Sequence, residues 1–431
     1  FNPAMRINRE LCVHELSAAL SAGPWRSGED GGDEGIGAVG QPVCALDAFA
    51  ATGALAIRLA LESGEAMAAA SDDDEGAQRR LIVTAADLDA RCIGLAKSSA
   101  ALSGVCTGEV VRASLINDEP AAVANGATPP PSQPLHTTDE RLSEDEAFGG
   151  QEPPSPSEPP HIVPPPNAGS LRLAHADARA LLFLEANAYD YLHLDPFGSC
   201  APFLDAFLAR SPHGGLLSLT ATDTSALYAH YPAVALRTYG AELQRADPNF
   251  RESAVRVLCA AVATAAARQL RGVQILHATS AAHFVHVLLR VRRGAAAADS
   301  SVNLVRMLTT PDGASLGPMW AGPLNSPAFL RRCVTAAEAA AARPGASPSD
   351  QSAAAKARSI FERSLNDPGS PPFSRPTGHV SAAKLVAALR AAGYFACCSA
   401  FDGDATKKEC GTKRVRTDAP EEVVRQLMEA K

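Results

Sequence analysis

Short apolar runs that alternate with helical segments constrain the fold of this chain more than any other feature. Each run has the length of a β-strand and leads through an acid or a turn into the next helical segment. This alternation is typical of a parallel, doubly wound sheet with helices on both faces, so we predict an α/β fold. The runs expected to form strands are 43–47, 81–86, 171–174, 189–194 and 215–220, followed by a hairpin-like pair at 273–279 and 284–292.

Two changes of composition divide the chain. Residues 108–169 are rich in Pro, Ser and Glu and hold few large apolar side chains. Such a segment cannot bury enough surface to offset its ordering entropy, so we predict a disordered insertion there. From about residue 300 a turn-rich connector leads into helices and one short strand. We therefore predict a first domain at 1–299 and a smaller C-terminal α+β domain at 300–431.

The net charge of −8 is unevenly distributed. The acidic excess lies in three low-complexity stretches at 26–36, 72–75 and 108–166, and the remainder of the chain is basic. A basic folded part is compatible with a nucleic-acid partner. No apolar run reaches the length of a membrane span, so no membrane partner is expected. Ten cysteines without a CxxC pair predict reduced thiols in an intracellular protein of the nucleus, the cytoplasm or an organelle.

One strand end carries an unusual set of groups. The apolar run 189–194 stops at Asp195-Pro196-Phe197. In open α/β sheets, ligands bind beyond the carboxyl ends of the strands. At that place the three residues offer a carboxylate acceptor, a carbonyl freed from helical pairing by the proline, and a flat face for stacking. Together these groups can hold the exocyclic amine of a nucleobase, although a strand-ending turn with an aspartate cap is the simpler interpretation.

Two further aspartates follow strands. Asp87 after the second strand can accept both ribose hydroxyls of an adenosine, and Asp177 after the next can accept from its amine. The small-residue turn that ends at Gly53 allows close approach of a ligand. The second glycine of a dinucleotide fingerprint is missing, which favours S-adenosylmethionine over NAD as the cofactor. The alternative for each acid is a helix N-cap.

Several segments resemble the tRNA (guanine-26 N2)-dimethyltransferase family and occur in the order typical of that family. The matching segments are Phe1-Asn2-Pro3, Asn8-Arg9-Glu10, Leu46 to Gly53, Asp195-Pro196-Phe197-Gly198-Ser199, Gly215 to Asp223, Tyr239-Gly240, Gly317 to Pro323 and Arg416 to Pro420. The resemblance implies a class I (Rossmann-like) S-adenosylmethionine methyltransferase domain and a C-terminal domain that helps to hold tRNA.

The resemblance also implies roles for individual residues. Asp195 falls on the catalytic acid and Phe197 on a base-stacking residue, with Pro196 between them. Phe1 aligns with the second aromatic of the family's Phe-Tyr-Asn-Pro and is expected to contact RNA. The residues implied to contact the cofactor are Arg9, Asp87, Asp177 and Ala178. Asp47 and Gly53, at the end of the first strand and in the turn after it, are also expected to bind it.

The chain also departs from the family pattern. Leu55 replaces an arginine expected near the cofactor carboxylate, whereas Arg58 matches a second one, and serines stand where asparagines are common. Residues 294–316 contain no cysteine, so neither zinc nor another metal is expected. Glu252 and Arg256 lie four residues apart, which predicts an ion pair on a helix surface.

A basic run near the C-terminus is predicted to contact tRNA phosphates, with a solvated surface as the alternative. It consists of Lys407, Lys408, Lys413, Arg414 and Arg416.

These observations predict a monomeric tRNA guanine N2-methyltransferase that transfers one or two methyl groups to guanine 26. Asp195 and the Pro196 carbonyl would accept the two N–H bonds of the amine, and Phe197 would stack on the extruded base. Two alternatives remain open: a tRNA-binding protein with weakened catalysis, suggested by Leu55, and an amino-methyltransferase that acts on another RNA base.

Overall fold

The computed structural model of the protein describes most of the chain outside its acidic stretches. The described residues are 5–24, 35–38, 40–70, 79–105, 107, 111–113, 169–185, 189–245, 247–281, 283–311, 313–370, 372–377, 380–401 and 414–429. No helix in this part of the chain is long and apolar enough to span a membrane.

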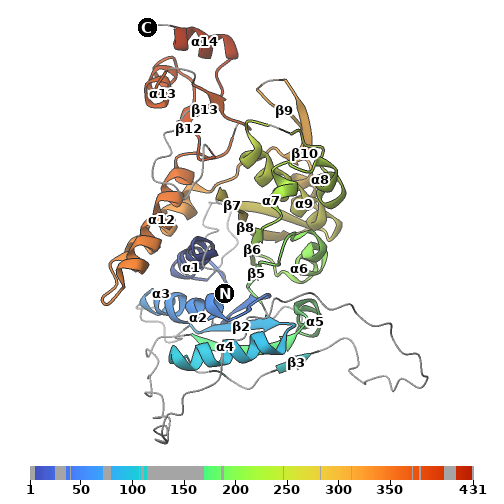
Figure 1. The fold of residues 1–431 in the computed structure, drawn as a ribbon, viewed down its shortest axis with the longest axis vertical. Helices are drawn as coiled ribbons and strands as arrows, with labels where there is room; N and C mark the ends of the chain where they lie inside the picture. The colour runs from blue at the N-terminus through green and yellow to red at the C-terminus, as the bar shows by residue number, and fades with distance from the viewer. Residues whose placement is uncertain are drawn as a thin grey trace, which may run out of the picture.

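A twisted central sheet organises the structure (Figure 1). Its strands, as far as they are described, follow the order β3-β4-β2-β1-β5-β6-β8-β7. The first six strands in this order, including β1 and β2, run parallel to one another. Strands β8 and β7 close the sheet as an antiparallel hairpin beside β6. The bounds are β1 Val43–Asp47, β2 Leu81–Asp87, β3 Val111–Ala113, β4 Ser170–Ala176, β5 Tyr191–Leu194, β6 Leu216–Ala221, β7 Arg271–Ala281 and β8 Phe284–Arg293.

Helices cover both faces of this sheet, because successive strand residues point to opposite sides. Along β1, Val43 and Ala45 enter one hydrophobic cluster and Leu46 enters the other. The first face is covered by α1 Arg6–Ser21, α2 Ala54–Arg58, α4 Ala90–Leu102, α11 Pro327–Ala341 and α12 Pro348–Leu365, and the second by α5 Ala178–Leu184, α6 Leu204–Arg210 and α9 Phe250–Arg268. The predicted α/β fold is thereby confirmed.

Local details differ from the sequence-based expectations. The helix after β1 continues through a π-helical turn, Leu59–Ser63, into α3 Gly64–Ala69. A single helix expected at 225–239 is divided into α7 Thr224–Leu227 and α8 Pro232–Tyr239. The break follows from Ala229, whose φ is 58°, and from Pro232, which cannot donate a helical hydrogen bond. Strand β3 lies inside the stretch predicted to be disordered, and most of that stretch is outside the described residues.

The C-terminal part packs in two different ways. After α10 Ala295–Val302, the pair β9 Val305–Thr309 and β10 Ser315–Trp320 packs into the cluster beneath α9. A separate small cluster is formed by α13 Ala382–Ala391, β12 Ala396–Cys398, β13 Arg414–Thr417 and α14 Glu421–Glu429, with β11 Arg375–Pro376 at its edge. This unit lies at one end of the molecule (Figure 1). A domain boundary near residue 300 stays a prediction, since segments beyond it share cores with the sheet.

A buried ion network fastens this unit to the sheet domain. Arg416 of β13 donates to both oxygens of Glu252 on α9 at 3.0 Å and to Asp367 at 2.5 Å. Arg256, also on α9, donates to Glu252 at 2.8 Å and to the Trp320 carbonyl at 2.7 Å. All four charged side chains are buried. We call these residues, Glu252, Arg256, Asp367 and Arg416, the ion network.

Two predictions from the sequence are wrong at this place. The Glu252–Arg256 pair is not on a helix surface, because the backbone at Trp320, Gly369 and Phe373, together with β13, covers that face of α9. Arg416 cannot contact RNA, because its guanidinium is 0% exposed and is committed to two carboxylates. Burial of an arginine requires such partners, and the sequence pattern alone does not reveal them.

Candidate active site

Four neighbouring strands end in an aspartate on the same side of the sheet. In spatial order β4, β2, β1 and β5, the residues are Asp177, Asp87, Asp47 and Asp195. We call them the acidic edge. Parallel strands present their carboxyl ends to one crevice, which is where open α/β sheets bind ligands. The sequence placed Asp87, Asp177 and Asp195 there.

Asp47 is the most enclosed of the four. Asp47 is only 3% exposed. Burial raises the pKa of the Asp47 carboxyl to about 7, and the charges of Asp195 and Asp87 add to that rise, while backbone N–H groups of Ala56 and Phe49 oppose it. The Asp47 carboxyl therefore lies in the field of two neighbouring carboxylates of the acidic edge. A cationic ligand would relieve this concentration of negative charge.

Asp195 lies directly beyond β5 and has a similarly shifted acidity. Burial raises the pKa of the Asp195 carboxyl to about 7, whereas the charges of His286 and Arg9 and a hydrogen bond from Asn8 lower it. A carboxyl with a pKa near neutrality is suited to general-base work. The Phe197 ring two residues later is fully exposed at 106%, which is unusual for a phenylalanine and leaves its face open for stacking.

The loop that carries Asp195 is held by hydrogen bonds to the segment that follows β6. Gly198 donates to Thr222 Oγ1 at 2.9 Å and accepts from the Thr222 N–H at 2.9 Å. Ser199 donates to Tyr239 Oη at 2.7 Å, and that hydroxyl donates to Asp223 at 2.8 Å. The segment after β5 is thus tied to the segment after β6, so Asp195 and Phe197 stand on a fixed platform.

The turn after β1 is shaped around Asp87. Ala51, with a φ of 46°, donates its N–H to Asp87 Oδ2 at 2.9 Å, and the Asp89 N–H donates to Oδ1 at 2.9 Å. Gly53 has a φ of 72°, and a Cβ added there would lie 2.9 Å from the Cβ of Ala96 on α4. A side chain at this position would therefore push the turn away from α4.

Asp177 acts as a helix cap. It accepts the N–H of Arg179 at 2.8 Å at the start of α5, and its second oxygen pairs with the Arg179 guanidinium at 2.6 Å. This pairing lowers the pKa of Asp177. Asp89 makes the same arrangement with Arg91 at the start of α4. The cap interpretation thus applies to Asp177, together with the buried Ala178 that follows it, while Asp87 is no cap.

The arginines near the site differ in their availability. Arg58 forms ion pairs with Glu10 at 2.8 Å and Glu62 at 2.5 Å, and Leu55 is buried beside it. Arg9 lies close enough to Asp195 for the carboxylate to raise its pKa, but burial and the charge of Arg58 produce a net lowering. Arg9 is therefore the arginine at the acidic edge that acts on Asp195.

A line of buried polar side chains continues from Asp195 into the core, and sequence reasoning missed it. Asn8 donates to Asp195 Oδ2 at 3.1 Å, and Thr220 Oγ1 donates to Asn8 at 3.0 Å. Thr220 Oγ1 lies 3.2 Å from His286 Nδ1, and His286 Nε2 lies 2.9 Å from Glu15. The signal in the sequence was Asn8 and Glu15, two polar residues two turns apart on one face of α1.

Three potential metal ligands lie along this line of polar side chains. Among the described residues, Cys12, Glu15 and His286 could offer three ligand atoms within 4.8 Å of one another. The oxygens of Glu15 already pair with His277 at 2.6 Å and His286 at 2.9 Å, which satisfies this buried carboxylate without an ion. The expected absence of a metal stays a prediction.

The remaining predicted contacts with RNA divide into two groups. Phe1, Lys407, Lys408 and Lys413 lie outside the described residues. Arg414 is half-buried and donates to Asn249 at 2.6 Å and to the hydroxyl of Ser374 at 3.1 Å. Part of its guanidinium is therefore used in hydrogen bonds within the protein.

The charge on the acidic edge predicts a pH-dependent stability. The folded state holds the Asp47 proton up to about pH 7, whereas the unfolded chain loses it near pH 4, so ionisation of Asp47 removes stability as pH rises between these values. The Asp47→Asn variant should therefore gain free energy of unfolding over the wild type by about 3 kcal/mol more at pH 8 than at pH 5. Urea unfolding at both pH values measures this difference.

The exposed Asp205 provides a matched control on α6. Asp205→Asn should differ from the wild type by the same small amount at both pH values. A stability difference between Asp47→Asn and the wild type that does not change with pH would show that the pKa of Asp47 is not raised in the folded state.

Comparisons with known proteins point to one family. Residues 167–311 match the family described as N2,N2-dimethylguanosine tRNA methyltransferase. The tRNA (guanine(26)-N(2))-dimethyltransferase of Thermococcus kodakarensis is 30% identical over 276 residues, covering 58% of this chain and 68% of that protein. The human tRNA (guanine(27)-N(2))-dimethyltransferase is 28% identical over 308 residues, covering 72% of this chain and 32% of that protein.

The structural comparison extends over nearly the whole chain. Trm1 from Pyrococcus horikoshii, solved in complex with S-adenosyl-L-methionine, superimposes with a TM-score of 0.66 at 21% identity, covering 99% of this chain and 94% of that one. The chain spans about a third of the length of its macaque and human relatives, 34% and 32%. The shared fold and the identity to the archaeal enzyme establish that the chain belongs to the tRNA (guanine-26 N2)-dimethyltransferase family.

Proposed function

We propose that this protein transfers methyl groups from S-adenosylmethionine to the exocyclic N2 amine of a guanine in tRNA, with guanine 26 as the target. The observation that carries the proposal is Asp195: a carboxyl with a pKa of about 7 on the acidic edge, followed by the fully exposed ring of Phe197. Membership of the family supports the choice of tRNA guanine over another RNA base.

The acidic edge suits a cationic adenosine-containing cofactor. Asp87 receives two backbone N–H groups, and a carboxylate offers about four lone-pair positions, so two remain for ribose hydroxyls. Asp47 and Arg9 flank the place where the charged end of the cofactor would lie, and Gly53 permits close approach of the turn. S-adenosylmethionine would supply an electrophilic methyl group at this place.

Asp195 and its neighbours would act on the guanine. The N2 lone pair is delocalised into the ring, which makes the amine a poor nucleophile. Asp195 and the Pro196 carbonyl would each accept one N–H, which turns the nitrogen toward tetrahedral geometry and aims its lone pair. Phe197 would hold the extruded base by stacking, and orientation of this kind can contribute roughly 7–11 kcal/mol to lowering a barrier. Asp195 would finally take the amine proton.

The polar line behind Asp195 would fix its orientation. Asn8 holds one carboxylate oxygen, Thr220 holds Asn8, and His286 contacts Thr220. Rotation of the Asp195 carboxylate would break the bond from Asn8, whose own position is fixed by the buried side chains behind it. Such pre-organisation lowers the reorganisation needed during the reaction.

The wider setting belongs to the same proposal. The C-terminal unit would help to hold tRNA, as the resemblance implies. The protein would act as a monomer and without a metal. The described cysteines form no disulfide, which supports a reducing intracellular compartment such as the nucleus or cytoplasm.

Mass spectrometry of nucleosides tests the proposal. Transfer RNA is incubated with the protein and S-adenosylmethionine, digested and analysed; guanosine should gain one or two methyl groups. A gain on adenosine would support an amino-methyltransferase acting on a different base. Guanosine left unchanged by the protein would overturn the proposed activity.

One observation favours a second candidate. Leu55 is buried, and Arg58 is committed to Glu10 and Glu62, so neither supplies the arginine that the family resemblance placed near the cofactor carboxylate. A tRNA-binding protein with weakened catalysis would show this pattern. Calorimetric titration with S-adenosylmethionine separates the two: the weakened protein would bind tRNA but not the cofactor.

A further inference from the structure

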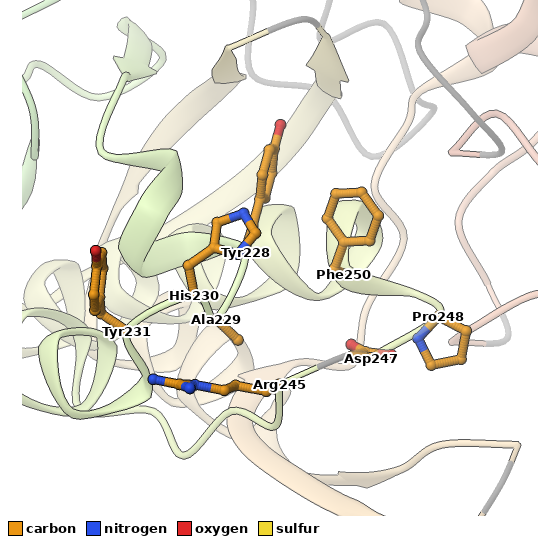
Figure 2. Close-up of a pocket in the computed structure, with 8 residues that line it drawn as sticks. All are labelled: Tyr228, Ala229, His230, Tyr231, Arg245, Asp247, Pro248 and Phe250. Carbon is orange, nitrogen blue, oxygen red and sulfur yellow. The ribbon is translucent and has the colours of Figure 1, made fainter.

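A second pocket lies outside the acidic edge and has no role in the proposed reaction. It has a volume of about 760 Å³, and the residues that line it are Tyr228, Ala229, His230, Tyr231, Arg245, Asp247, Pro248 and Phe250 (Figure 2). We call it the aromatic pocket. In Figure 2 the Tyr231 ring and the Arg245 guanidinium lie on one side of the pocket, and Phe250 lies on the other.

The aromatic pocket opens at the same edge of the sheet as Asp195. Tyr228 follows α7, which begins just after β6, and its hydroxyl lies 2.8 Å from Ser280 Oγ at the end of β7. Ser280 pairs with Val285, and Val285 pairs with Ala221 at the carboxyl end of β6. Three strand spacings separate β5 from β7, or about 14 Å at the usual spacing of about 4.8 Å.

The pocket is also connected to the loop that carries Asp195. Gly198 and Ser199 of that loop bond to Thr222 and, through Tyr239, to Asp223. The chain then passes through the single turn of α7 into Tyr228 and Tyr231. A ligand that contacts both the Asp195 loop and the aromatic pocket would lie on one continuous segment of the chain.

The inner wall of the pocket is rigid. The Tyr228 and Phe250 rings meet edge to face, with centroids 4.9 Å apart. The Arg251 guanidinium lies over both, 5.6 Å from the Tyr228 centroid and 5.1 Å from the Phe250 centroid. Cation–π contacts of this kind keep the positive charge beside the rings.

The outer side of the pocket is open to a ligand. Tyr231 is 59% exposed, an unusual value for an aromatic residue that only helps packing. Arg245 is exposed and forms no ion pair with any residue that the structure describes. An accessible ring beside an available guanidinium matches a nucleotide, whose base stacks on aromatic faces and whose phosphate pairs with arginine.

We propose that the aromatic pocket binds a second nucleotide of the same RNA, a few residues along the strand from the guanine held at Asp195. This inference rests on the proposed function, since it takes tRNA as the ligand. The base would stack on Tyr231, and Arg245 with His230 would contact the phosphate. Anchoring of a neighbouring nucleotide would hold the strand while the target base is extruded.

Equilibrium binding of tRNA to the full chain, measured by fluorescence anisotropy over a series of salt concentrations, tests this proposal. Tyr231→Ala should weaken binding about tenfold, as loss of one stacked base does, and leave the salt dependence unchanged. Arg245→Ala should weaken binding and reduce the slope of log K against log [salt] by about one. Neither variant should change the affinity for S-adenosylmethionine or the melting temperature.

Two control variants match the test residues in kind. Phe183, an exposed aromatic beside Arg210, ends α5 at the opposite edge of the sheet, and Arg358 is an exposed arginine on α12, which covers the other face. Phe183→Ala and Arg358→Ala should bind tRNA like the wild type.

The outcomes distinguish the two proposals. If the wild type binds tRNA and both pocket variants bind it equally well, the pocket does not hold RNA and this inference is overturned. If the wild type binds tRNA and Tyr231→Ala weakens binding while no guanosine is methylated, the pocket stands and the proposed activity falls. If the wild type binds no tRNA, both fall.

Discussion

Replacement of Asp195 by asparagine is expected to reduce methyl transfer to guanosine about a thousandfold and to leave tRNA binding intact. The amide has the same shape, so the hydrogen bond from Asn8 can persist, but it cannot take a proton and offers a weaker acceptor to the amine. Methyl transfer is measured with labelled S-adenosylmethionine, and tRNA binding by anisotropy. Full activity of the Asp195→Asn variant would remove this carboxylate from the mechanism.

The pH dependence of the wild type provides an independent check on the same residue. Asp195 has to be ionised to take the proton of the amine, and burial raises its pKa to about 7. Methyl transfer should therefore decline as pH falls through about 7. Asp205→Asn, which alters an exposed carboxylate on α6, should keep both the rate and the profile of the wild type. A wild-type rate that is constant between pH 6 and 8 would contradict the assigned acidity.

Replacement of Arg416 by methionine should have the largest effect on stability, a loss of about 3–5 kcal/mol in the free energy of unfolding. The change leaves Glu252 and Asp367 buried near a single remaining cation, Arg256, and uncompensated buried charge is costly. Urea unfolding measures the loss. Binding of tRNA to the variant, measured well below its unfolding midpoint, should match the wild type, because Arg416 is buried.

Arg425→Met is the matched control for this change, since Arg425 is exposed on α14 of the same C-terminal unit. It should alter the free energy of unfolding by no more than about 0.5 kcal/mol. If Arg416→Met and Arg425→Met unfold at the same urea concentration, the ion network does not hold the C-terminal unit to the sheet domain.

Much of the fold followed from local patterns. The expected strand at 43–47 agrees with β1, and the expected hairpin agrees with β7 and β8, because apolar alternation and turn residues act over a few positions. Asp87 and Asp195 could be assigned to one edge of the sheet because parallel strands share their direction. The division of the helix at 225–239 was missed, since Ala229 adopts a backbone conformation that its side chain does not reveal.

The sequence by itself determined the order of strands and helices, the aspartates at the strand ends and the resemblance to a tRNA-modifying family. Only the tertiary structure decided which charges are buried. Arg416 and Glu252 are 164 residues apart in the sequence. Because they pair in the interior, Arg416, which was predicted to contact RNA, instead stabilises the packing of the C-terminal unit. The raised pKa values of Asp47 and Asp195 and the aromatic pocket have the same origin. Burial and the distance between charges depend on which segments pack together, and that is set by the whole fold rather than by neighbours along the chain.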